Sequence, residues 1–171
     1  KPITWWIENT TPLELRDAVK DGVLAWNKAF EAAGFINAIE VKVQPDDADW
    51  DAGDIRYNVL RWASSPSPPF SGYGPSFVNP RTGQILGADI MLEYSSFTYR
   101  VKTEKIFETF SGEEFLEDEH SCQFSQVMQE NNLFAMIASR TIGDFSSLEQ
   151  HRIIYEALVD LSLHEIGHTL G

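Results

Sequence analysis

The order of apolar patterns along the first half of the chain most constrains its fold. Residues 39–43, Ile-Glu-Val-Lys-Val, alternate strictly between apolar and polar side chains, as a strand with one solvated face does. Residues 12–33 instead repeat their apolar side chains at helical spacing. The expected elements are strands at 3–8, 39–43 and 55–62, a helix at 12–33, and a hairpin of residues 76–78 and 84–93 around the turn 79–83. This order indicates the α/β fold class with a mixed sheet.

The helix at 12–33 has sequence signals at both ends. Thr11 is expected to be its N-cap and Pro12 its first residue, with Glu14 completing a capping box. Gly34 is expected to end the helix.

Length, composition and charge limit the class of protein and its partners. A chain of 171 residues with a hydrophobic fraction of 43% suits one domain with a single packed core. The formal net charge is −13, which would repel phosphate groups, so nucleic acid and anionic membrane surfaces are not expected partners. No apolar run approaches the roughly 18 residues that span a bilayer. Cys122 is the single cysteine, so no internal disulfide is expected.

The second half of the chain is expected to be mainly helical. Residues 113–131 suggest a helix with an acidic outer face, and residues 133–140 a shorter one. The last helix is expected to begin at Ser146 or Ser147, each of which has an acidic or amide residue three positions later. Its inner side would carry Ile153, Ile154, Ala157, Leu158, Leu161, His164 and His168.

This last helix ends in the sequence His164-Glu-Ile-Gly-His168, a His-Glu-x-x-His pattern. Residues four apart lie one above the other on a helix, so both imidazoles can reach one zinc ion, at about 2.0–2.1 Å each. The pattern fixes only three positions and also arises by chance on surface helices. Its coincidence with a capped, amphipathic helix favours zinc as a cofactor, with His164 and His168 as ligands.

Glu165 lies one residue step from the first histidine, which places its carboxylate beside the ion without ligating it. There it would act as the general base that takes a proton from zinc-activated water and returns it to the leaving amine. The predicted reaction is the hydrolysis of peptide bonds.

A catalytic zinc ion normally needs a third protein ligand. Gly171 stands three residues after His168, where the longer pattern His-Glu-x-x-His-x-x-Gly-x-x-His has its glycine. The third histidine of that pattern would lie three residues beyond Gly171. His151 lies on the same expected helix, about 20 Å from His164, and cannot share the ion. His120 remains a less favoured candidate.

Three segments resemble the metzincins, the clan of zinc peptidases that includes matrixins, adamalysins and astacins, and are most similar to a bacterial group of large metzincin-like proteins. They are His164-Glu-Ile-Gly-His-Thr-Leu-Gly171, Gly74-Pro-Ser-Phe-Val-Asn-Pro-Arg-Thr-Gly-Gln-Ile-Leu-Gly-Ala-Asp-Ile90 and Ala25-Trp-Asn-Lys-Ala-Phe-Glu-Ala-Ala-Gly-Phe35. The resemblance implies that residues 1–171 form the N-terminal, upper subdomain of a catalytic domain. It has a twisted, mainly parallel sheet, an antiparallel edge strand and two long helices, and the lower subdomain is absent.

The resemblance also implies how a substrate binds. The edge strand of such enzymes pairs with an extended polypeptide, and here residues 85–93 are expected to be that strand. The expected substrate-binding residues are Ile85, Leu86, Gly87, Ala88, Asp89 and Ile90. The resemblance favours a secreted, periplasmic or cell-surface location.

Other interpretations stay open. Because the third ligand is missing, the fragment is expected to be inactive by itself, and the scaffold would alternatively serve as a non-catalytic peptide- or protein-binding module. A zinc hydrolase acting on a non-peptide substrate would share the motif. Asp47, Asp49 and Asp51 resemble the start of a calcium loop, but the twelfth position is Asn58, so a solvated acidic loop is favoured. Asp160, one helical turn before His164, is a less favoured candidate to orient its imidazole.

Overall fold

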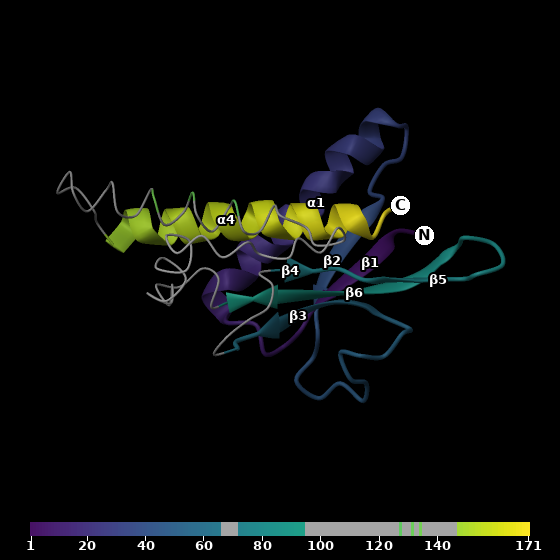
Figure 1. The fold of residues 1–171 in the computed structure, drawn as a ribbon, viewed down its shortest axis with the longest axis horizontal. Helices are drawn as coiled ribbons and strands as arrows, with labels where there is room; N and C mark the ends of the chain where they lie inside the picture. Colours follow the sequence, from purple (N-terminus) through teal and green to yellow (C-terminus); the bar gives the residue numbers. More distant parts are fainter. Residues whose placement is uncertain (66–71, 95–126, 128–130, 132–133, 135–146) are drawn as a thin grey trace, which may run out of the picture.

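The computed structural model describes residues 1–65, 72–94, 127, 131, 134 and 147–171, and within these the chain forms one mixed sheet with two long helices on one face (Figure 1). The strands are β1 (Ile3–Ile7), β2 (Ile39–Val43), β3 (Asn58–Ala63), β4 (Gly72–Tyr73), β5 (Ser76–Val78) and β6 (Ile85–Glu93). The helices are α1 (Arg16–Ala32) and α4 (Ser147–His168), and a short 3₁₀ helix, η1 (Leu13–Leu15), precedes α1. The predicted α/β class with a mixed sheet is confirmed.

The strands follow the order β2-β1-β3-β6-β4, and β5 also pairs with β6. β1 runs parallel to β2 and β3, and β3 runs parallel to β6. β4 and β5 run antiparallel to β6, and β5 is joined to it by the expected hairpin turn, where Gly83 has a φ of 71°. The sheet is therefore parallel except at β4 and β5.

The prediction that residues 85–93 form an edge strand is wrong. β6 pairs with β3 from Asp89 onward on one side, and with β4 and β5 on the other. Its side chains explain this position, because Ala88, Ile90 and Leu92 are at most 2% exposed and belong to the core. A strand with such a buried face is stabilised by neighbours on both sides.

The start of α1 differs from the expected capping box, and its end agrees with expectation. No side chain caps either η1 or α1. Arg16 orders this region instead, because its guanidinium donates to the carbonyl oxygens of Thr11 and Asn9 at 2.8 and 2.7 Å. At the other end Gly34 has a φ of 91°, and the Phe35 N–H returns to the Phe30 carbonyl at 2.8 Å, the bond typical of a Schellman ending.

The core lies between the sheet and the two helices. Trp5, Ile7, Leu60, Ile90 and Leu92 come from the sheet, and Ala18, Val19, Val23, Ala157, Leu158, Leu161 and Ile166 come from the helices. Burial of such apolar surface is the main favourable contribution to folding, about 25 cal/mol per Å².

Close contact between α1 and α4 depends on two small residues. A Cβ atom at Gly22 would lie 2.5 Å from the Val159 carbonyl oxygen and 2.7 Å from the Ser162 Cβ. A Cβ atom at Gly167 would lie 2.9 Å from the Trp26 ring, whose indole N–H donates to the Leu163 carbonyl at 2.8 Å. These contacts hold the last turns of α4 in place over α1.

Some expectations lie outside the described residues. They include most of the helices predicted at 113–131 and 133–140, His120, Cys122 and the side chains near the start of α4. Among the residues that are described, no helix is both long and apolar enough to cross a bilayer.

Candidate metal centre

The two histidines of the motif converge at the C-terminal end of α4. Their Nε2 atoms lie 3.0 Å apart, and their rings meet edge to face with centroids 4.6 Å apart. His164 is half-buried and His168 is exposed. This arrangement follows from helix geometry, since residues four apart share a face.

The separation of the two nitrogens suits one metal ion. With metal–nitrogen distances of about 2.05 Å, nitrogens 3.0 Å apart subtend roughly 95° at the ion, and a small rotation of either ring would reach the tetrahedral angle. Within the described part of the chain no group of three or more His, Cys, Asp or Glu side chains is placed to hold a metal. The described residues therefore offer a two-histidine pair.

The chain leaves the helix directly after this pair. The Thr169 N–H donates to the Ile166 carbonyl at 3.0 Å and the Leu170 N–H to the Gly167 carbonyl at 3.2 Å, so the last turn tightens. Gly171 then has a φ of 101°, as expected for a residue that turns the chain out of a helix.

Glu165 points into the protein, beneath β4. The residue is 2% exposed, and its Oε1 has no hydrogen-bond partner. Cβ atoms built at Gly72 and Gly74 would lie 2.5 Å from its Oε1 and 3.2 Å from its Oε2, respectively. The backbone at the two glycines therefore lies directly over the carboxylate. A larger residue at Gly72 would displace either the strand or the carboxylate.

Burial determines the protonation of this site. Desolvation raises the pKa of Glu165 from 4.5 to about 7. The pKa of His164 is lowered, first by desolvation and then by the neighbouring charge of His168. Both shifts favour neutral side chains near neutral pH, and a neutral imidazole is the form that binds metal.

The sequence alone did not predict that Gly72 and Gly74 cover the Glu165 carboxylate. Gly72 and Gly74 flank Tyr73, and a Gly-x-Gly spacing on a strand puts two positions without side chains on the same face. That signal was present, but only the tertiary structure shows which side chain the two glycines admit.

The residues predicted to bind substrate are divided between core and surface. Ile85 and Leu86 are 36% and 54% exposed, whereas Ala88 and Ile90 are buried at 2% and 0%. Asp89 is partly buried, and desolvation raises its pKa against the opposing effect of Arg61. Among these six residues, Ile85 and Leu86 therefore have the most accessible side chains.

Asp160, one helical turn before His164, lines a groove with Asp21 and Tyr155. The Tyr155 hydroxyl donates to the Asp21 carboxylate at 2.5 Å. This groove lies between α1 and α4, so it belongs to the packing of the two helices.

Comparisons of the chain with protein-family models, with curated proteins and with solved structures found no match.

Proposed function

We propose that the end of α4 is the active-site helix of a zinc-dependent endopeptidase of the metzincin type. His164 and His168 are its metal ligands and Glu165 its general base. The observation that carries the proposal is the 3.0 Å separation of the two Nε2 atoms, with the buried Glu165 carboxylate between them in sequence.

Zinc bound here would supply Lewis-acid chemistry, polarising a peptide carbonyl and making water more acidic. Glu165 accepts a proton from the attacking water and passes it to the leaving amine. Its pKa of about 7 suits both steps, because a base near the working pH takes up and releases a proton with little cost.

The substrate of the proposed enzyme is a polypeptide in extended conformation. β4 lies against Glu165, since Gly72 and the following Gly74 cover its carboxylate. The substrate-aligning role therefore passes from β6 to β4 and β5, which run antiparallel to β6. Tyr73, Phe77 and Val78 expose apolar side chains along them.

Two measurements on the full-length natural protein test this proposal. Isothermal titration should show one zinc ion bound per chain, and His164→Ala should abolish that binding. Glu165→Gln should retain zinc but reduce cleavage of an unfolded protein substrate by at least 100-fold, because the proton acceptor is gone. Glu156→Gln, at a solvent-exposed position of α4, is the matched control and should be neutral. Zinc binding with equal cleavage by wild type and Glu165→Gln would refute the mechanism.

The alternative is a non-catalytic peptide-binding module on the same scaffold. In that case the wild-type protein would bind peptide without any turnover.

A further inference from the structure

Strand β4 lies against α4 and contacts β6 on its other side (Figure 1). A Cβ atom at Gly72 would lie 2.5 Å from Oε1 of Glu165, and one at Gly74 would lie 3.0 Å from the Glu165 carbonyl oxygen. Neither glycine has a positive φ, so the close approach of the strand to the helix, rather than a special backbone conformation, excludes a side chain here. Glu165 is 2% exposed beneath this strand.

This closed arrangement separates the proposed general base from solvent. A general base takes a proton through a direct hydrogen bond or through one bridging water, so the carboxylate of Glu165 must be reachable. Among the described residues no donor bonds to its Oε1. Burial of an unpaired carboxylate oxygen costs free energy, and opening of the arrangement would return that oxygen to water.

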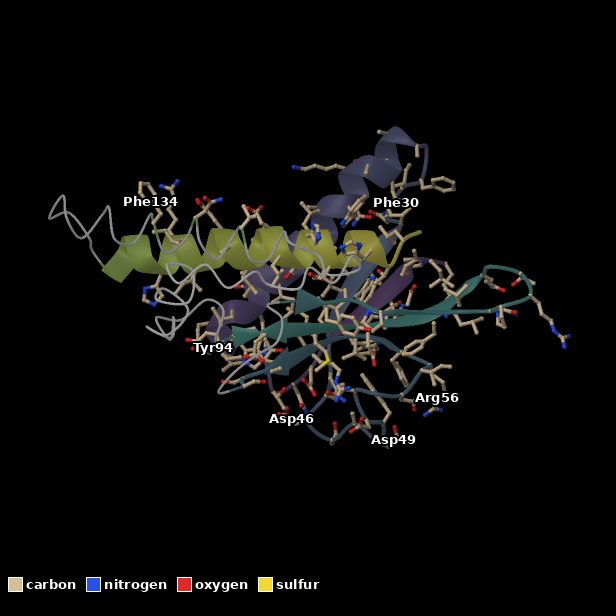
Figure 2. All side chains as sticks on the ribbon, in the orientation of Figure 1. Phe30, Asp46, Asp49, Arg56, Tyr94 and Phe134 are labelled. Atoms are coloured by element: carbon tan, nitrogen blue, oxygen red, sulfur yellow. The ribbon has the colours of Figure 1, made fainter. Side chains whose placement is uncertain are left out.

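β4 is held less firmly than the strand beside it. It has two residues, neither of them buried, and in the described part of the chain β6 is its one strand neighbour. β6 also pairs with β3, and Figure 2 shows Tyr94 at its end, where the ring packs on Trp62 with centroids 5.3 Å apart. Short edge segments with few buried contacts open at a lower free energy than core strands do. Of the two strands, β4 is therefore the one that can move.

We propose that residues 72–75 form a strap that keeps Glu165 latent, and that this strap must lift from α4 before the carboxylate can act. The two glycines fit the strap closely to Glu165, and its short pairing with β6 lets it open. The consequence for catalysis rests on the proposed peptidase function. The opening itself does not, because it concerns access to one carboxylate and needs no metal.

A disulfide between β4 and β6 would hold the strap closed. Tyr73 lies opposite Met91, and both side chains point away from α4, since Gly72 and Gly74 face it. Opposite residues of antiparallel strands lie about 4.5–5.5 Å apart, which a disulfide can span. The test protein is the full-length natural protein with Tyr73→Cys and Met91→Cys, in which Cys122 and any further cysteine are replaced by Ser.

Carbodiimide coupling of an amine to carboxylates, read by mass spectrometry in the presence of EDTA, measures access to Glu165. In wild type, Glu165 should react at least tenfold more slowly than Glu31, an exposed residue of α1. Oxidation of the engineered pair should slow the reaction at least tenfold further, and reduction should restore it. A matched disulfide between Val78 and Ile85, which pair near the hairpin turn, should leave the labelling of Glu165 unchanged. Thermal melts verify that each protein is folded.

Two labelling results would each overturn the proposal. Equal labelling of Glu165 and Glu31 would show that the carboxylate is not occluded, and unchanged labelling on oxidation would show that Glu165 reaches solvent while β4 stays in place. With zinc bound, oxidation of the Tyr73→Cys, Met91→Cys protein should reduce cleavage at least 100-fold without changing zinc binding. A wild-type protein that never cleaves would refute the peptidase function, whereas the labelling would still decide whether the strap opens.

Discussion

At the scale of single residues, Glu165 shows how a local motif acquires its properties from distant parts of the chain. Its position between two histidines is evident in the sequence, but its burial is not. The carboxylate is 2% exposed because strand β4, more than 90 positions earlier in the chain, lies over it with two glycines. A buried carboxylate oxygen without a hydrogen-bond partner, as Oε1 is, lowers stability, and such groups are often found at functional sites.

Replacing Gly72 by Ala should disturb this cover. The added Cβ would lie 2.5 Å from Oε1 and 2.9 Å from two carbons of Glu165, so either β4 or the carboxylate must move. We expect a loss of about 1–3 kcal/mol in the free energy of unfolding, measured by urea titration. Gly53→Ala is the control, because its nearest atom would be the Asp51 carboxylate oxygen at 3.3 Å. Equal stability of the two variants would contradict the arrangement.

At the scale of elements, α4 carries the site and α1 holds it in place. The two helices touch where Gly22 faces Val159 and Ser162, and where Trp26 bonds to Leu163, one residue before His164. The amphipathic patterns of both helices were predictable, because they follow from the spacing of apolar residues. The point at which the helices meet was not, because it depends on two surfaces that are distant in sequence.

Gly22→Ala should separate the effect of packing from that of helix propensity. At an exposed position inside a helix, replacing Gly by Ala raises the free energy of unfolding by about 0.5–1 kcal/mol. Here we expect destabilisation of about 1–3 kcal/mol, since the Cβ would lie 2.5 Å from the Val159 carbonyl oxygen. Lys20→Ala, at an exposed position of the same helix, should change stability by less than about 0.5 kcal/mol. A Gly22→Ala protein more stable than wild type in thermal melts would show that the helices do not pack in this way.

At the scale of the whole molecule, the buried Glu165 links stability to pH. Its pKa in the folded protein, about 7, lies above the ordinary value of 4.5, so the folded state holds the proton more tightly than the unfolded state does. The contribution of the protonated Glu165 side chain to the free energy of unfolding is therefore complete below about pH 4.5. It declines as the pH rises toward 7 and is absent above it.

This prediction is checked on the metal-free protein. The difference in unfolding free energy between wild type and Glu165→Gln should change by at most about 3 kcal/mol between pH 4.5 and 7.5. Wild type should lose stability relative to the variant as the pH rises. A difference that is flat over this range would show that the carboxylate is solvated in the folded state.

The sequence by itself determined what depends on neighbours along the chain. The strands expected at 3–8, 39–43 and 84–93 follow from local spacing, and the structure has them at Ile3–Ile7, Ile39–Val43 and Ile85–Glu93. The end of α1 at Gly34 and the shared helix face of His164 and His168 follow from local spacing as well. Only the tertiary structure decided that β6 lies inside the sheet and that glycines cover Glu165. The physical reason is that these features depend on which buried surfaces meet across the core, and such contacts join residues that are far apart in sequence.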